Sequence, residues 1–423
     1  MNHLIVLLAA FTALPGAIFA WSEPPHQAIT RAAVDALPEW QQTLLGAELD
    51  NLAVKYCMIP DNVFTDKENA KYAAMDSKPG EVYLTILHLP TQQPEYLEAM
   101  RFFMGKAVTS VREGKMSEAA RHMGTICHQL EDYGSPSHTV PGDNQFQLLQ
   151  QFLPASEAMK DKLLHGPIES GELKVKLTDY KPALLGTSVD EAAWRLMHRV
   201  HEGIVNARSA TIPIIQALYA EDKDAVSQHQ LRAATVDAQI VADMLHTVLC
   251  IGAQRFDEAQ RAAVQSVPIS AFFPLEAASL YFPQSQFFSS PYFGPPRVGS
   301  VLAGGKSRTS LQLKVGADTQ TFTEGISAGM GRSLTFLLPK GVYQRFSVLA
   351  GLHSELGLEG RVEFTISGDG RTLDSATLNG SDPARRFDCD VSSVSQIQLT
   401  LTSRGLDGKS NYAIWAAPTL IKK

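Results

Sequence analysis

The sequence has little of three features that would narrow its function at once. It carries only four cysteines in 423 residues, its charged residues amount to 19%, and Lys and Arg do not outnumber Asp and Glu. A formal net charge of -7 gives no general attraction to nucleic acid or anionic lipid, so a phosphate-bearing partner must be held locally, for instance by a metal ion. Cysteines this few and this widely spaced form no disulfide framework, although a Cys57–Cys127 pair stays open.

Long apolar runs are scarce as well. The run Leu4–Leu14 is too short to cross a bilayer, and a Pro-Gly pair breaks it before the small residue Ala20. This pattern predicts a signal peptide over residues 1–20 and a secreted or periplasmic protein of bacterial type that begins at Trp21. The weak basic region before the run leaves an uncleaved anchor as the alternative. No later stretch reads as a membrane span.

Apolar residues recur three and four apart through the first part of the mature chain, which is typical of amphipathic helices. The clearest stretches are Ile29–Leu37, Tyr96–Val111, Ala119–Leu130, Val189–Ile204 and Ala234–Leu249. They predict an all-helical domain over residues 21–259. Residues 260–306 are rich in Pro, Phe, Tyr and Ser, which favours an ordered connector over a flexible linker.

The apolar period changes to two in residues 307–423, as expected for half-buried strands. The alternating stretches are Ser310–Val315, Leu334–Leu338, Phe346–Leu349, Val362–Ile366 and Gln396–Thr402. Glycine-rich turns separate them, which predicts a β-sandwich. The expected fold is therefore multidomain, with an all-α domain followed by an all-β sandwich.

The segment from Cys127 to His138 carries the sharpest chemical signal. His128 and Asp132 are four residues apart, so on a helix they share one face and can grip one ion. Gly134 and the following Pro end the helix and return His138 to the same face. A cluster of nitrogen and oxygen ligands suits Zn2+. The alternative is a His–Asp pair that only forms a hydrogen bond.

This segment resembles the HxxxDxxxxxH core of zinc-dependent phospholipase C and of its relatives, the S1/P1-type nucleases. The resemblance covers about residues 21–255. Members of these families begin, after signal removal, with a Trp whose amino nitrogen and carbonyl bind zinc, which is the position of Trp21. In the nuclease branch a His follows five residues later, as His26 does.

The resemblance implies three zinc ions. The first would be held by Asp61, His88, His128 and Asp132, with Asp66 or Asp76 as substitutes because the gap between Asp61 and His88 is long. The second would be held by the amino terminus of Trp21, by His26 and by a bridging Asp132. The third needs His138 and an HxxxE pair. The expected metal ligands are Trp21, His26, Asp61, His88, His128, Asp132, His138, His198 and Glu202.

Two HxxxE pairs compete for the third ion. His198 and Glu202 have the right spacing within a convincing helix, and we expect them to be the ligands. His165 and Glu169 are nearer to His138 in the sequence, but the proline between them argues against a regular helix. If His198 and Glu202 form only a solvated helix face, the protein has two metal ions or impaired catalysis.

The function that the resemblance implies is a secreted zinc-dependent phosphodiester hydrolase of the phospholipase C type, with Asp61 orienting the attacking water or taking its proton. The alternative is an S1/P1-type single-strand nuclease. A Glu at the third site favours the phospholipase branch, and the Trp21–His26 spacing favours the nuclease branch. Asn62 stands where a choline-binding branch has Tyr, and Phe64, Tyr72 or Tyr83 could stack on a base.

The last part of the chain resembles the NPCBM family of bacterial modules, which are named for binding carbohydrate. The matching stretches are Thr321–Gly325, Tyr343–Gly351, Gly360–Gly370 and Ala413–Pro418. Asn411 and Tyr412 replace the Asp-His of the family, so the sequence does not decide whether this module binds a glycan. We expect Trp415 to close the core rather than to form a stacking platform. A non-catalytic glycan-binding protein with a degenerate metal site is the remaining alternative.

Overall fold

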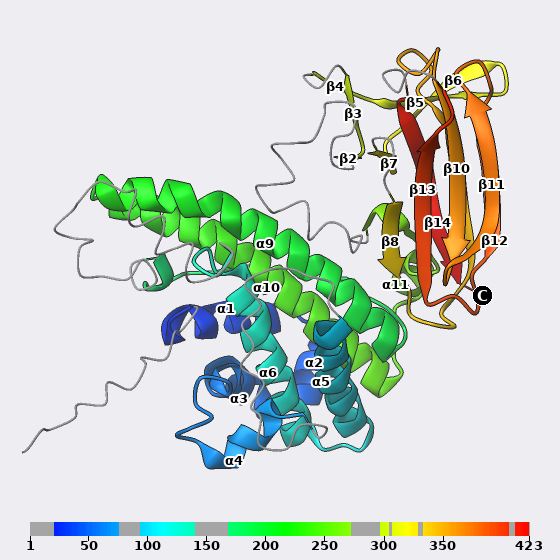
Figure 1. Cartoon of the computed structure of the whole chain (residues 1–423). Helices are drawn as coiled ribbons and strands as arrows, with labels where there is room; N and C mark the ends of the chain where they lie inside the picture. The colour runs from blue at the N-terminus through cyan, green and yellow to red at the C-terminus, as the bar shows by residue number, and fades with distance from the viewer. Residues whose placement is uncertain are drawn as a thin grey trace, which may run out of the picture.

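The computed structural model describes residues 21–75, 94–139, 168–271, 297–303, 307–328, 333–405 and 411–422. Helices come first and strands follow, so the predicted order of an all-α domain and an all-β domain is confirmed (Figure 1). The helical elements are α1 (Glu23–Asp35), α2 (Glu39–Leu45), α3 (Glu48–Val54), η1 (Tyr56–Met58), α4 (Lys67–Ala70), η2 (Lys71–Ala73), α5 (Pro94–Arg112), α6 (Met116–Gly134), α9 (Val189–Tyr219), α10 (Lys223–Ala253), α11 (Glu258–Ala263) and η3 (Ile269–Ala271).

Two long helices, α9 and α10, run side by side through the helical domain (Figure 1). Side-chain caps start both of them, because Ser188 accepts a hydrogen bond from an amide of the first turn of α9 and Asp222 does the same for α10. By length and composition α10 could cross a membrane, but 83% of its apolar window is buried inside the protein. It is therefore the central helix of the helical core.

The strands form two main antiparallel sheets. One has the order β12-β9-β14-β7-β2, with β1 also paired to β14, and the other has the order β11-β10-β13-β8. The strands are β1 (Ser266–Pro268), β2 (Arg297–Val298), β3 (Val301–Ala303), β4 (Ser307–Thr309), β5 (Leu311–Val315), β6 (Asp318–Phe322), β7 (Gly325–Ala328), β8 (Ser333–Leu337), β9 (Tyr343–Leu352), β10 (Arg361–Gly368), β11 (Arg371–Asn379), β12 (Arg385–Asp390), β13 (Gln396–Ser403) and β14 (Ala413–Lys422).

Trp415 lies in the core of this β domain. Its side chain is fully buried, and its ring meets Phe364 of the other sheet edge-on at 5.1 Å between centroids. The expectation that Trp415 closes the core is therefore confirmed. The Cys57–Cys127 disulfide that the sequence left open is not formed, since all four cysteines are buried free thiols.

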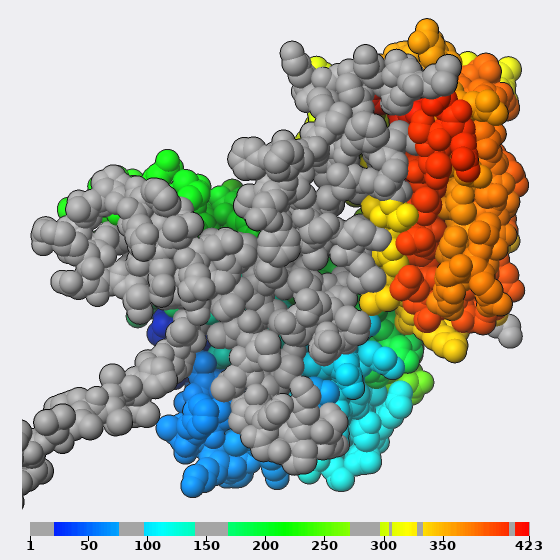
Figure 2. All heavy atoms as spheres, viewed as in Figure 1, coloured from blue at the N-terminus to red at the C-terminus, as the bar shows by residue number. Residues whose placement is uncertain are grey.

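The two domains share a buried contact. Trp194 of α9 joins the hydrophobic cluster of the β domain, and nearby Lys422 Nζ lies 2.6 Å from Glu191 Oε2. The region predicted as a connector also contributes to the sheet, because Val267 of β1 pairs with Leu420 of β14. In the space-filling view, the red and orange β domain forms one side of the molecule beside the blue and cyan helices (Figure 2).

Candidate metal centre

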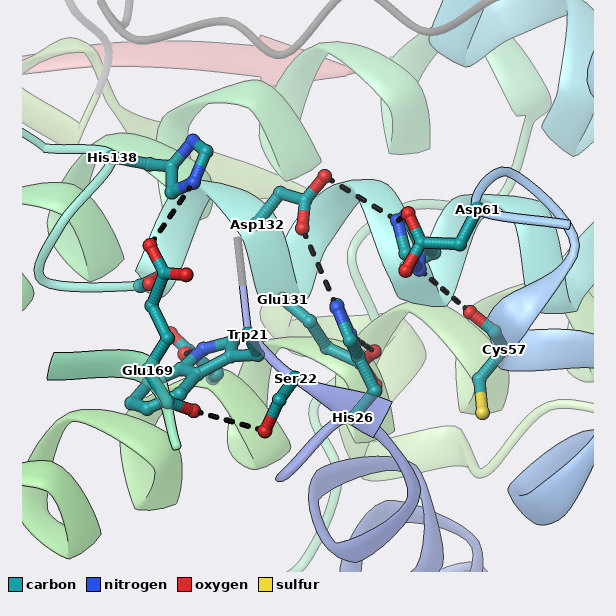
Figure 3. A network of polar contacts seen from close by, with 12 residues as sticks. Trp21, Ser22, His26, Cys57, Asp61, Glu131, Asp132, His138 and Glu169 are labelled. Carbon is teal, nitrogen blue, oxygen red and sulfur yellow. Dashed lines mark hydrogen bonds and ion pairs between the residues drawn. The ribbon is translucent and has the colours of Figure 1, made fainter. Parts of the chain in front are cut away.

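Helix α6 presents His128 and Asp132 on one face, as their spacing predicts. His128 Nε2 lies 3.5 Å from Asp132 Oδ2, and both side chains are buried. The helix ends at Gly134, and the following turn is closed by a hydrogen bond from the His138 amide to the Ser135 carbonyl. This turn returns His138 toward the same face (Figure 3).

The orientation of His128 depends on close packing of η1 against α6. A Cβ atom at Gly124 would lie 2.4 Å from the Tyr56 carbonyl oxygen, so only glycine permits this approach. One turn later, the Cys57 carbonyl accepts a hydrogen bond from His128 Nδ1 at 2.8 Å. The Nε2 atom of His128 therefore faces Asp61, whose Oδ1 is 3.3 Å away, and Asp132.

Helix α1 brings a second imidazole to Asp132. His26 Nε2 lies 3.6 Å from Asp132 Oδ1, and the His26 ring stacks on His128 with 4.2 Å between centroids. His26 Nε2 and Asp132 Oδ1 are both buried, and among the described residues neither atom has a hydrogen-bond partner. Buried polar atoms of this kind need a further partner, such as a water molecule or an ion.

The amino-terminal residues of the mature chain lie beside the same centre. The amide and the hydroxyl of Ser22 both donate to the Glu169 carbonyl, at 3.4 and 3.3 Å. This pairing holds Glu169 next to the amino terminus, where its Oε1 lies 3.5 Å from His138 Nε2 (Figure 3). The Trp21 side chain is fully buried, and its indole Nε1 donates to Asp237 Oδ2 at 3.4 Å.

The structure favours a different carboxylate from the one we expected at His138. The Glu202 side chain is 49% exposed and contacts Arg199 and His198, both on its own helix α9. Glu169, from the pair that the intervening proline argued against, is the carboxylate beside His138. Ile168 and Glu169 are helical, and the Glu169 carbonyl accepts the hydrogen bonds from Ser22 that hold this segment beside the amino terminus.

Other expected ligands have separate outcomes. His88 and His165 lie outside the described residues, as does the substitute Asp76. The other substitute, Asp66, instead caps α4, because its Oδ1 accepts a hydrogen bond from the Asn69 amide at 3.2 Å. Asp61 therefore stays the early carboxylate of the centre.

Sequence reasoning missed two buried carboxylates. Glu131 Oε2 lies 2.6 Å from His26 Nδ1, and Asp237 of α10 contacts the Trp21 indole. Asp237 lies so close to α6 that a Cβ atom at Gly134 would lie 1.5 Å from its Oδ1. Gly134 therefore serves this contact as well as ending the helix. A contact between residues so distant in sequence leaves no periodic signal in the sequence.

The buried charges of the centre shift one another's pKa values. Burial, helped by the neighbouring His128, lowers the pKa of His26 to about 3. Burial also acts to lower the pKa of His128, but Asp132 and Asp61 outweigh it and raise that pKa to about 10. Burial raises the pKa of Asp132, and it raises the pKa of Glu131 to about 8. Carboxylates desolvated together in this way are stabilised by a cation.

Several distances of the centre match the separation of two ligands on one ion. Two ligands about 2 Å from one tetrahedral ion lie about 3.3 Å apart, whereas an N–H···O hydrogen bond is about 2.9 Å long. Four imidazole–carboxylate contacts among the described residues of the centre measure between 3.3 and 3.6 Å, namely His128–Asp61, His128–Asp132, His26–Asp132 and His138–Glu169, whereas His26–Glu131 measures 2.6 Å. Imidazole and carboxylate are also ligands that zinc accepts.

Among the comparisons with known proteins, one family model matches the C-terminal part of the chain. Residues 295–421 match the family model described as NPCBM/NEW2 domain, so the expected NPCBM-like module is confirmed, and the match begins inside the predicted connector. A search of curated protein sequences finds no match.

Solved structures give only distant likenesses. The CBM51-2 and INT domains of Clostridium perfringens ZmpB share 19% identity and a TM-score of 0.28 over 30% of this chain, which spans 28% of that structure's length. The CBM51 module of Clostridium perfringens GH95 in complex with methyl-galactose shares 14% identity and a TM-score of 0.30, over 37% of this chain and 99% of that one. The alpha toxin of Clostridium absonum shares 11% identity and a TM-score of 0.33, over 95% of this chain and 93% of that one.

Proposed function

We propose that this chain is a secreted zinc-dependent phosphodiester hydrolase of the phospholipase C type. The observation that supports the proposal best is the centre itself, where buried imidazole and carboxylate atoms from distant segments lie at ligand-to-ligand distances. The resemblance of the His128–His138 segment to zinc-dependent phospholipase C supplies the reaction class. The signal-like residues 1–20 support export, and their removal would free the Trp21 amine.

The proposed ligands fall into three sets around Asp132. Asp61, His128 and Asp132 hold one ion, with His88 as the expected fourth ligand. The Trp21 amino terminus, His26 and Asp132 hold a second ion. His138 and Glu169 hold a third, with His165 of the same HxxxE pair replacing the His198 that we expected. Asp132 suits the bridging role, because its two oxygens face His26 and His128 separately.

Bound zinc would supply a water of lowered pKa and positive charge for the phosphodiester oxygens. Among the proposed ligands whose side-chain exposure the structure describes, Asp61 is the most exposed, at 15%. A carboxylate at the open edge of the centre is placed to orient the attacking water or to take its proton. Three residues later in the sequence, the Phe64 side chain is 78% exposed, so its apolar ring is available at the surface for a substrate.

Two features bear on the choice between phospholipid and nucleic acid. The carboxylate beside His138 is a Glu, which favours the phospholipase branch, while the Trp21–His26 spacing favours a single-strand nuclease. The deciding experiment compares hydrolysis of phospholipid vesicles and of single-stranded DNA by the mature protein, with an Asp132→Ala variant as control. Headgroup release that the variant lacks supports phospholipase C. Cleavage of DNA without hydrolysis of phospholipid supports the nuclease instead. Hydrolysis by the Asp132→Ala variant at the wild-type rate contradicts both functions.

A glycan-binding role for the β domain is a second proposal, supported by the NPCBM match over residues 295–421. The described part of that domain exposes the large apolar side chains Val298, Leu358 and Leu373, none of them aromatic, and Trp415 is buried. Recognition would therefore rely on polar groups in the parts that the structure describes. Binding of the full protein to a panel of immobilised glycans tests this role, and no retention on any glycan contradicts it.

A further inference from the structure

Glu131 is a buried carboxylate of α6 that is not among the proposed zinc ligands. Both of its oxygens are engaged, since Oε2 lies 2.6 Å from His26 Nδ1 and Oε1 accepts a hydrogen bond from the Thr30 hydroxyl. His26 and Thr30 are one turn apart on α1, so Glu131 meets one face of that helix at two points. The side chain is fully buried.

The length of its contact with His26 distinguishes Glu131 from the proposed ligands. By position alone, His26, His128 and Glu131 lie near enough to one another to surround an ion. The 2.6 Å contact to His26, however, is a hydrogen-bond length, whereas His26 Nε2 lies 3.6 Å from Asp132. Because His26 uses Nδ1 for Glu131, its Nε2 atom is the one that faces Asp132. Glu131 therefore lies behind His26 and not in the ring of ligands.

We infer that Glu131 is a positioning residue, which fixes His26 with the proton on Nδ1 and Nε2 directed at Asp132, and so sets the affinity of the ion that His26 helps to bind. The inference rests on the proposed function. Carboxylates that hold the far nitrogen of a zinc-bound His orient the ring and make it a stronger ligand.

The neighbouring imidazole provides an internal comparison. His128 has the same orientation, but its Nδ1 donates to the neutral Cys57 carbonyl. The two stacked rings thus have different groups behind them, a side-chain carboxyl for His26 and a backbone carbonyl for His128. Replacing Glu131 should therefore weaken the ion at His26 while leaving the ion at His128 in place.

The test uses mature protein with Glu131→Gln, which keeps the size of the side chain and removes its charge. A matched control is Glu191→Gln, because Glu191 is equally buried in the helical domain but faces the β domain. Zinc is titrated into metal-free protein in a chelator buffer. We expect Glu131→Gln to lower the affinity of one ion by about 10-fold or more, the range for such partners, and to leave the others unchanged. The control should bind zinc like the wild type.

A second readout needs no metal. Nitrogen-15 NMR of the metal-free protein, at a pH above the raised pKa of Glu131, should find the proton of His26 on Nδ1, and Glu131→Ala or Thr30→Val should shift it toward Nε2. If folded Glu131→Gln protein binds every ion as the wild type does, or if wild-type His26 carries its proton on Nε2, the inference is overturned and the proposed function stands. If wild-type protein binds no zinc, both are overturned.

Discussion

His138 Nε2 and Glu169 Oε1 lie 3.5 Å apart, and this contact joins the turn after α6 to the segment that pairs with Ser22. The amino terminus, the end of α6 and residues 168–170 therefore meet in one place. Because each segment would supply a different ligand type, the proposed centre depends on the folded chain rather than on any local motif. This arrangement makes the role of Glu169 testable against that of Glu202.

Glu169→Ala should remove one zinc ion and lower hydrolysis by more than about 100-fold, because loss of a ligand should exceed the 10- to 100-fold cost of losing a partner behind a ligand. The matched variant is Glu202→Ala, whose side chain is half exposed and contacts Arg199. It should keep its zinc and its activity. Elemental analysis and phosphodiester turnover measure both effects. The reverse ranking of the two variants would restore the original pair, His198 and Glu202.

The second prediction concerns the amino terminus. A mature protein that begins at Trp21 should bind one more zinc ion than a protein with a single Ala added before Trp21, because an amide nitrogen cannot replace a free amine as a ligand. The indole of Trp21 would stay bonded to Asp237 in both proteins, so folding should not differ. Zinc content and thermal unfolding distinguish the two effects. Equal zinc content in both would exclude the amino terminus from the centre.

Much of this fold could be predicted from apolar periodicity, because each helix or strand buries one face. The helical pattern of Ala119–Leu130 and the alternation of Val362–Ile366 both match elements of the structure, α6 and β10. The His128–Asp132 pair could be found for the same reason, since four residues on a helix fix a shared face.

The rest of the site could not be predicted because it depends on contacts between distant segments. Glu169 lies beside the amino terminus because its carbonyl accepts hydrogen bonds from the Ser22 amide and hydroxyl, and Asp237 occupies the space that Gly134 leaves. Glu131 precedes Asp132 directly, so the motif gave it no separate role. For the carboxylate beside His138, sequence spacing alone favoured His198 and Glu202 on a regular helix. In the structure these two residues contact each other.

The domain interface gives the third prediction. Lys422 and Glu191 form an ion pair whose side chains are 9% and 1% exposed, and Tyr343 also contacts Glu191. Lys422→Met should lower the free energy of unfolding by about 3 kcal/mol, because it leaves a buried carboxylate without its cation. Adding Glu191→Gln should recover part of that loss. Urea denaturation of the single and double variants measures this coupling, and strictly additive effects would contradict it.

A pH dependence is expected from His353 in the β domain. Its Nδ1 accepts hydrogen bonds from the amides of Glu355 and Leu356 at 3.2 and 3.3 Å, and its Nε2 donates to the Ser310 carbonyl at 3.2 Å. This arrangement requires the neutral ring, and burial lowers the pKa of His353. As the pH falls, the unfolded chain, whose His pKa is about 6.5, takes up the proton at a higher pH than the folded protein does.

The contribution of His353 to stability is therefore complete above about pH 6.5 and declines as the pH falls toward the lowered pKa of the folded state. His353→Gln should be less stable than the wild type near neutral pH but should lose less stability on acidification. Thermal unfolding of both proteins from about pH 7 to about pH 5 measures the difference. Parallel losses in the two proteins would show that other groups govern the acid dependence.

The most direct test of the central claim is reconstitution of mature, metal-free protein with zinc, followed by hydrolysis of bis-p-nitrophenyl phosphate. The account predicts no turnover without metal, recovery as zinc is restored, and no recovery in Asp132→Asn, whose carboxylate lies between His26 and His128. Turnover that persists without zinc, or a zinc-loaded protein that hydrolyses no phosphodiester, would contradict it.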